Sequence, residues 1–128
     1  MALDVLIVDD SAAIRKILLR VLAQTNLTIG EVFEAGDGVE ALKTLETKKV
    51  DLVLSDINMP NMDGLQFLTS VRARPEWKAI PVIMITTEGS QAKVLEAVQL
   101  GAQGYVRKPF TADQIKEKIT ACLSGVGQ

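Results

Sequence analysis

Short runs of consecutive apolar residues constrain the fold of this chain most strongly. Residues 5–8, 52–54 and 82–85 are continuous apolar runs that are rich in β-branched side chains. Such runs are typical of strands that are covered on both faces in a parallel sheet. The more mixed segment 28–35 predicts an edge strand, and segment 103–107 predicts a short fifth strand.

Segments with a helical period separate these runs. Their apolar residues recur at spacings of three and four, which places them on one face of a helix. These residues are Ile14, Ile17, Leu18, Val21 and Leu22; Ile115, Ile119, Cys122 and Leu123; and the pairs Leu42 and Leu45, Leu65 and Leu68, and Leu95 and Val98. Strands that alternate with helices predict βαβ crossovers and a parallel sheet. We therefore expect one α/β domain over residues 1–128, with too few residues after the last helix for an output domain.

Several helices are expected to begin at capping residues. Ser11 stands where it would cap the first helix. The pairs with the spacing of a capping box are Asp37 and Glu40, Asp63 and Gln66, and Thr111 and Gln114.

The composition excludes several classes of function. A formal net charge of -2 argues against a nucleic-acid or membrane binder that relies on bulk charge. Without histidine, the chain offers no histidine metal ligand, general base or phosphohistidine. A single cysteine, Cys122, excludes an intramolecular disulfide. No apolar stretch approaches the roughly 20 residues of a membrane span, and no basic leader begins the chain, so we expect a cytoplasmic protein.

Reactive polar residues follow the predicted strands. In open α/β sheets, ligands bind outside the carboxyl ends of the strands, where the strand order reverses. The residues at these ends are Asp9 and Asp10 after the first strand, Asp56 after the third, Thr86 and Thr87 after the fourth, and Lys108 after the fifth. They converge on one crevice if all the strands are parallel.

Such a set has a specific chemistry. Three carboxylates that share a crevice repel one another, and Mg²⁺ or Mn²⁺ with oxygen ligands would offset their charge. A carboxylate such as Asp56 can attack phosphorus, while a lysine and a hydroxyl bind the other phosphoryl oxygens. Each residue alone has a simpler explanation, as a helix cap, a turn exit or a loop residue. Only the whole set is specific.

Four motifs in this order resemble the receiver domain of two-component response regulators, and the resemblance covers essentially the whole chain. They are Val8-Asp9-Asp10-Ser11, Asp56-x-Asn58-Met59-Pro60-x-Met62-Asp63-Gly64, Ile85-Thr86-Thr87 and Lys108-Pro109-Phe110. The resemblance implies a flavodoxin-like, doubly wound (βα)5 three-layer sandwich with a parallel sheet of strand order 2-1-3-4-5.

The resemblance also assigns roles to the site residues. Asp56 matches the phospho-acceptor, and Mg²⁺, which Mn²⁺ can replace, would be held by Asp9, Asp10, Asp56 and the backbone carbonyl of Asn58. The residues that bind the phosphoryl group or transmit the switch are Thr86, Thr87, Lys108 and Tyr105, and those that flank the site are Glu88 and Pro109, which follows a cis peptide in the family.

A partner surface is implied as well. When Thr86 is drawn to the phosphoryl group, the ring of Tyr105 moves inward and changes the surface formed by the fourth helix, fifth strand and fifth helix. The residues expected on this surface are Lys93, Tyr105, Arg107 and Lys116.

The expected function is that of a phosphorylation switch. A histidine kinase supplies the phosphoryl group, and the domain catalyses only its own phosphorylation and dephosphorylation, so it is not an enzyme toward an external substrate. A lone receiver with Asn58, Glu88 and Tyr105 is similar to the CheY type of chemotaxis. That similarity implies a CheA-like kinase and a flagellar motor switch protein or phosphatase as partners. Thr87 departs from the family pattern, in which a smaller residue is common at this position. Its side chain would slow the access of water or of the kinase to the site.

Other functions stay open at this point. A receiver of another phosphorelay and a phosphate-independent docking module have the same fold. A phosphohydrolase of the haloacid dehalogenase type needs Asp-x-Asp, whereas Asp9 and Asp10 are adjacent. An FMN carrier needs a Ser/Thr/Gly phosphate loop, and the first loop here is acidic.

Overall fold

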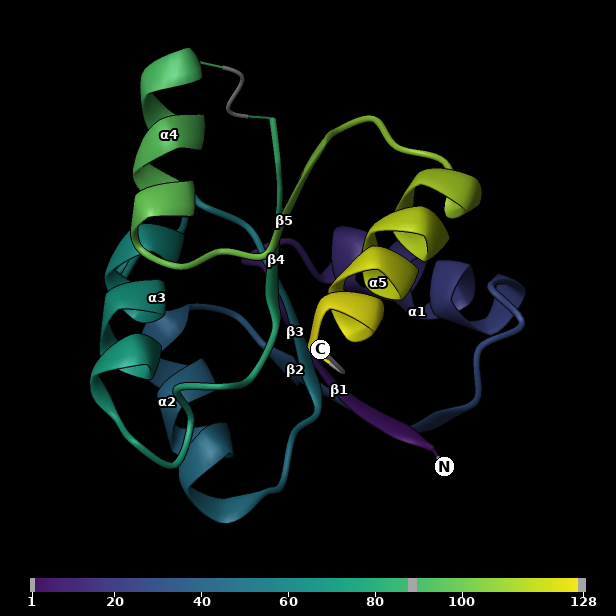
Figure 1. The fold of residues 1–128 in the computed structure, drawn as a ribbon, viewed down its shortest axis with the longest axis horizontal. Coiled ribbons are helices and arrows are strands. Elements are labelled where there is room, and N and C mark those ends of the chain that lie inside the picture. Colours follow the sequence, from purple (N-terminus) through teal and green to yellow (C-terminus); the bar gives the residue numbers. More distant parts are fainter. Residues whose placement is uncertain (1, 88–89, 127–128) are drawn as a thin grey trace.

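The computed structural model describes residues 2–87 and 90–126, and in these residues five strands alternate with five helices (Figure 1). In chain order they are β1 (Leu3–Val8), α1 (Ala12–Gln24), β2 (Ile29–Ala35), α2 (Gly38–Thr47), β3 (Leu52–Ser55), α3 (Gly64–Ala73), β4 (Val82–Thr86), α4 (Gln91–Gln99), β5 (Gly104–Arg107) and α5 (Ala112–Val126). No helix in the described part of the chain is long and apolar enough to cross a membrane.

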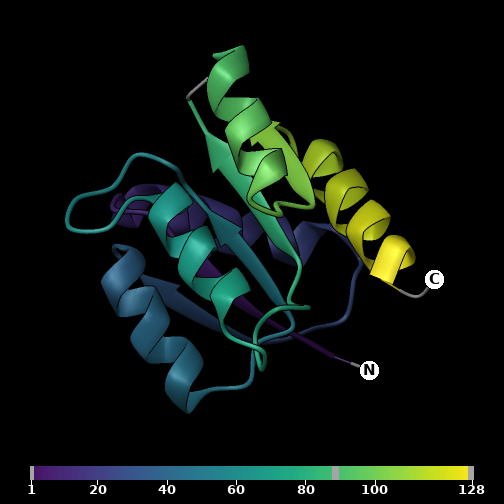
Figure 2. The same cartoon turned by 60° about the vertical axis from the view of Figure 1, so that its left-hand side comes forward.

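The strands form one parallel sheet in the order β2-β1-β3-β4-β5, which confirms the predicted topology. Helices α1 and α5 cover one face of the sheet, and α2, α3 and α4 cover the other, as Figures 1 and 2 show from two directions. The order reverses at β1, because β2 lies on one side of it and β3 on the other. This is the point at which open α/β sheets bind ligands.

The apolar strands supply two cores. Successive side chains of a strand point to opposite faces. Leu6 and Val8 of β1 pack under α2, α3 and α4, whereas Val5 and Ile7 pack under α1 and α5. All four are at most 1% exposed, which explains why the run is apolar without alternation.

Three apolar side chains that the helical spacing placed toward a core are exposed instead. Ile17 of α1 is 43% exposed, and Leu95 and Val98 of α4 are 54% and 56% exposed. In α4 the buried residue is the small Ala97, with Val94 half-buried beside it. Spacing by three identifies a shared face, but it does not say whether that face meets the sheet.

The predicted capping residues begin their helices. Ser11 accepts a hydrogen bond from the backbone N–H of Ile14. The box of Asp63 and Gln66 and that of Thr111 and Gln114 each have both reciprocal bonds. At α2, Asp37 accepts from the Glu40 N–H, but the Glu40 carboxylate accepts from the N–H of Gly36 rather than from that of Asp37.

Asp37 also anchors the loop between β3 and α3. Its Oδ2 accepts a hydrogen bond of 2.7 Å from the amide of Asn61, which adopts a φ of +65° that asparagine tolerates well. The Asn61 amide, together with the Glu40 N–H, holds the pKa of the Asp37 carboxyl below its usual range. The folded state therefore favours the ionised form of this cap.

We expect Asp37→Asn to lower the free energy of unfolding by about 1 kcal/mol at pH 7, because the hydrogen bond from the Asn61 amide loses its charged acceptor. Because the folded pKa of Asp37 is lowered, its carboxylate contributes stability above about pH 4, and this is lost as the pH falls through the folded value. Urea unfolding of both proteins between pH 7 and pH 3 should show the difference shrinking toward acid. A difference that is constant with pH would contradict this role for the charge.

Candidate functional site

Two of the predicted acidic residues leave neighbouring strands at the reversal point. Asp9 follows β1 and Asp56 follows β3, and the sheet ladder continues one step into both. The Asp9 N–H donates to the Ala35 carbonyl at 3.0 Å, and the Asp56 N–H donates to the Val8 carbonyl at 2.9 Å. Their positions are thus determined by the sheet rather than by a free loop.

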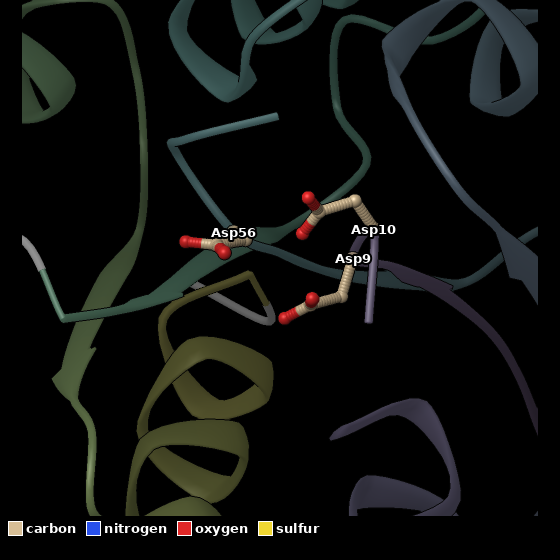
Figure 3. Close-up of side chains that lie close together, drawn as sticks. All are labelled: Asp9, Asp10 and Asp56. Atoms are coloured by element: carbon tan, nitrogen blue, oxygen red, sulfur yellow. The ribbon is translucent and has the colours of Figure 1, made fainter. Parts of the chain in front are cut away.

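The three carboxylates converge, as Figure 3 shows. Asp9, Asp10 and Asp56 each offer an oxygen, and these oxygens all lie within 4.8 Å of one another. Asp9 and Asp56 are buried, while Asp10 is exposed and opens the cluster to solvent. Oxygen donors at this spacing fit a hard divalent cation that keeps some of its water ligands. The donor set therefore suits Mg²⁺ or Mn²⁺.

Lys108 is the positive charge of the crevice. Its Nζ lies 2.8 Å from Asp9 Oδ2 and 3.3 Å from Asp56 Oδ2. Its N–H donates to the Thr86 carbonyl at 2.8 Å, which fixes the backbone of this residue next to the end of β4. The Lys108–Pro109 peptide is cis, as predicted.

Burial and ion pairing have opposite effects on the pKa values of Asp9 and Lys108. Burial raises the pKa of the Asp9 carboxyl, and the hydrogen bond from Lys108 offsets only part of that effect. Burial also disfavours the Lys108 ammonium, but the two carboxylates outweigh it and raise the pKa of Lys108. The lysine is therefore charged at neutral pH and available to an anionic group that enters the crevice.

In each of the two buried carboxylates, one oxygen accepts a hydrogen bond from a backbone N–H and the other contacts Lys108. Asp9 Oδ1 accepts from the Ser11 N–H at 2.9 Å, and Asp56 Oδ1 accepts from the Ile57 N–H at 2.7 Å. The second oxygen of Asp56 has the longer contact with Lys108, at 3.3 Å. A carboxylate held in this way has a fixed direction of attack on an electrophile.

The two threonines at the carboxyl end of β4, Thr86 and Thr87, occupy different environments. Thr86 is fully buried at the carboxyl end of β4, where it pairs with Arg107 of β5, and Tyr105 pairs with Met84 two positions earlier. Tyr105 is half-buried and packs against the core under α2, α3 and α4. Thr87 is exposed and lines a mostly apolar hollow of about 380 Å³ together with Ile14, Ile17, Lys108, Pro109 and Phe110.

The residues predicted for a partner surface are only partly together. Tyr105 and Arg107 line a hollow of about 420 Å³ beside β5, whose other lining residues are Val106, Lys108, Pro109, Gln114 and Lys118. Lys93 lies on α4 in a 3.9 Å ion pair with Glu96. Lys116 lies about 200° around α5 from Gln114 and from Lys118, so it faces away from this hollow. Gln114 and Lys118 were not predicted from the sequence, although their spacing of four on α5 was an available signal.

For two predicted site residues, the predicted roles stay predictions. Asn58 lies exposed in the loop after β3, and its backbone carbonyl stays a predicted metal ligand. Glu88 lies outside the described residues. Arg15, which contacts the backbone of Asp9, was not predicted from the sequence. A basic residue close to the start of a helix, where the helix dipole disfavours it, was the signal.

The fold and the crevice define a doubly wound α/β protein with an acidic, lysine-containing site at its switch point. Residues 5–120 match the family model described as "Response regulator receiver domain". The chain therefore belongs to the response regulator receiver domain family. Members of this family act as phospho-accepting switches and bind Mg²⁺ at an acidic cluster of the kind seen here. This membership separates the chain from the phosphohydrolase and FMN-carrier classes.

Three known proteins illustrate the similarity. The chain is 42% identical over 117 residues to the chemotaxis protein CheY-3 of Vibrio cholerae, covering 91% of this chain and 88% of the relative. The structure of the chemotaxis response regulator CheY4 of Vibrio cholerae superposes with a TM-score of 0.79 at 36% identity, over 98% of this chain and 99% of that one. The Mn²⁺-bound form of response regulator Rcp1 superposes with a TM-score of 0.78 at 26% identity, over 95% and 92% of the two chains.

Proposed function

We propose that this chain, over residues 1–128, acts as a response regulator receiver domain that is switched by phosphorylation of Asp56. The observation that carries the proposal is the crevice itself: three converging carboxylates, two of which share one half-buried lysine. Of the two buried carboxylates, Asp56 is the one whose second oxygen has the longer contact with Lys108, 3.3 Å against 2.8 Å for Asp9. It lies at the switch point of the sheet, where a phosphoryl group can enter from solvent.

The reaction follows from these positions. Asp56 Oδ2 attacks phosphorus, the bond between phosphorus and the donor's imidazole nitrogen breaks, and the electron pair stays on that nitrogen. No side-chain base is needed, because an attacking carboxylate has no proton to lose. Lys108 moves its contact from Asp56 to a phosphoryl oxygen and offsets the added charge. Mg²⁺, held by Asp9, Asp10, Asp56 and the Asn58 carbonyl, would neutralise charge on the phosphoryl oxygens.

Reversal uses the same site. Water attacks the acyl phosphate and restores the Asp56 carboxylate, with Thr87, Glu88 and Pro109 flanking the reacting group. Thr87 is exposed at the edge of the crevice, which supports its influence on access. The domain catalyses only its own phosphorylation and dephosphorylation and converts no external metabolite.

The signal would pass to β5 through Thr86 and Tyr105. Thr86 is buried at the end of β4 beside the strand that carries Tyr105, so a hydroxyl drawn to the phosphoryl group leaves space that the Tyr105 ring can enter. Phosphorylation then biases a two-state equilibrium of the surface formed by α4, β5 and α5. A complete reversal from 1:99 requires about 5.5 kcal/mol of differential stabilisation.

The chemotaxis role is supported by the relatives. Two of the similar proteins are named chemotaxis regulators, and both are covered over most of their length. We therefore propose that this chain acts in the cytoplasm, with a CheA-like histidine kinase as phosphodonor and a flagellar motor switch protein or a phosphatase as target. The hollow beside β5 carries Arg107 and Lys118, which would favour an acidic segment of that target.

Phosphotransfer from a purified, radiolabelled CheA-like kinase tests this function. We expect the label to move to this chain in Mg²⁺ and to stay on the kinase in EDTA. If the label stays on the kinase in Mg²⁺ while acetyl phosphate modifies the chain, the chain serves another phosphorelay. If neither donor modifies the chain, the docking-module alternative replaces the switch.

We expect Thr86→Ala to separate phosphorylation from the switch. The variant should accept the phosphoryl group within a few-fold of the wild-type rate, because Thr86 is not the nucleophile. It should lose the phosphorylation-dependent changes in the amide NMR signals of α4 and β5. Thr47→Ala, at an exposed threonine at the end of α2, is the control and should keep those changes. Equal responses from the two variants would contradict the role of Thr86.

A further inference from the structure

Arg15 connects three elements at the edge of the acidic site. It is the fourth residue of α1, and its side chain is 20% exposed. Its Nη1 donates to the backbone carbonyl of Asp9 at 2.6 Å, and its Nε donates to Glu34 Oε1 of β2 at 3.0 Å. A positive charge near the start of a helix opposes the helix dipole, so this placement costs stability unless its contacts compensate.

The contact with Asp9 completes the restraint of that residue. Its N–H is held by Ala35, its Oδ1 by the Ser11 N–H and its Oδ2 by Lys108. Arg15 holds the remaining polar group, the carbonyl oxygen. Because a peptide unit is planar, the direction of the Asp9 carbonyl also sets the position of the Asp10 nitrogen and Cα.

Asp10 depends on this backbone restraint. It is exposed, and in the part of the chain that the structure describes no group donates a hydrogen bond to its carboxylate. Its oxygen nevertheless lies within 4.8 Å of the ligand oxygens of Asp9 and Asp56. The Asp10 carboxylate is therefore aimed by its main chain alone.

From this arrangement we propose that Arg15 is a positioning residue: it fixes the Asp9–Asp10 peptide so that Asp10 is presented to a divalent cation, and Glu34 holds the guanidinium in place. The inference rests on the proposed function, since it assumes that the three carboxylates bind Mg²⁺. Glu34 suits this role because hydrogen bonds from Lys16 and Arg15 lower its pKa and keep it ionised.

Lys16 provides a matched control for charge. It carries the same charge one residue later and pairs with the same Glu34, through Oε2 at 3.0 Å. It is 62% exposed and does not contact Asp9. Simple electrostatics predicts that loss of either positive charge strengthens cation binding. Positioning predicts the opposite sign for Arg15 alone.

The test is titration calorimetry with Mg²⁺ on the wild-type chain, Arg15→Gln and Lys16→Gln, with the melting temperature of each measured in EDTA. We expect Arg15→Gln to bind Mg²⁺ about tenfold more weakly, as is typical when a group that orients a ligand is lost. Lys16→Gln should bind as tightly as wild type or more tightly. Saturating Mg²⁺ should restore the rate at which Arg15→Gln reacts with acetyl phosphate.

Arg15→Lys covers the case in which Arg15→Gln does not fold. One ammonium cannot hold both the Asp9 carbonyl and Glu34 as the guanidinium does, so this variant should show an intermediate loss of affinity. Wild-type affinity in Arg15→Gln, or in Arg15→Lys if only that variant folds, would overturn the inference. An equal loss in Lys16→Gln would do the same. If the wild-type chain itself fails to bind Mg²⁺, the proposed metal site fails, and the inference fails with it.

Discussion

Asp56→Asn is expected to abolish the phosphoryl adduct while leaving the fold intact. The amide has no anionic oxygen to attack phosphorus, so the loss should be complete rather than partial. The free energy of unfolding should stay within about 1 kcal/mol of wild type, because Lys108 keeps its 2.8 Å partner Asp9 and one charge is removed from a crowded acidic cluster. Intact mass after incubation with acetyl phosphate and Mg²⁺ measures the first effect, and urea unfolding measures the second.

Asp63→Asn is the control for this experiment. Asp63 lies on the same loop, but its carboxylate caps α3 by accepting from the Gln66 N–H at 2.8 Å. Asparagine also caps helices well, so this variant should keep both the adduct and most of its stability. An adduct in Asp56→Asn would show that another residue is the acceptor.

Gly64→Ala should destabilise the folded chain more than the loss of any single polar contact of the site. Gly64 begins α3 directly against the end of β3, and its N–H donates to the Ile57 carbonyl at 2.7 Å. An added Cβ would collide with the Asp56 carbonyl oxygen and lie 2.8 Å from Ile57 Cα. Both are backbone atoms, so the helix and the strand must separate. We expect a loss of about 3 kcal/mol, at the upper end of the usual cost of overpacking.

The same substitution should slow phosphorylation by up to about 10²-fold, because the atoms that it displaces belong to the acceptor residue and its neighbour. Urea unfolding followed by fluorescence of Trp77, which is 6% exposed, measures the stability. Gly36→Ala is the control, since its Cβ would meet its nearest atom, Glu40 Oε1, at 3.5 Å, an ordinary contact. Similar losses in both variants would contradict the explanation given for Gly64.

Local patterns were sufficient to predict a parallel sheet and the core of the site, whereas the strand order was implied by the resemblance to receiver domains. Strands buried on both faces read as continuous apolar runs, and the strand ends carry the polar residues. Once the strands are parallel, their carboxyl ends share one edge, so the convergence of Asp9, Asp10 and Asp56 follows. The boundaries differ by one or two residues: β3 extends to the polar but fully buried Ser55, whose hydroxyl donates to the Asp56 carbonyl.

Contacts between distant elements could not be predicted in this way. The hydrogen bond from Asn61 to Asp37 joins residues 24 positions apart, and the one from Arg15 to Glu34 joins residues 19 positions apart. Periodicity also leaves open which way a helix is turned. That is why Leu95 is exposed although its spacing predicted burial, and why Lys118 rather than Lys116 lines the hollow beside β5.

The central claim is a Mg²⁺-dependent transfer of a phosphoryl group to this chain. Intact mass spectrometry of the wild-type chain after incubation with acetyl phosphate, in Mg²⁺ and in EDTA, tests it most directly. We predict a single phosphoryl adduct in Mg²⁺ and no adduct in EDTA. A folded chain that binds Mg²⁺ but stays unmodified, or that is modified equally in EDTA, would contradict the claim.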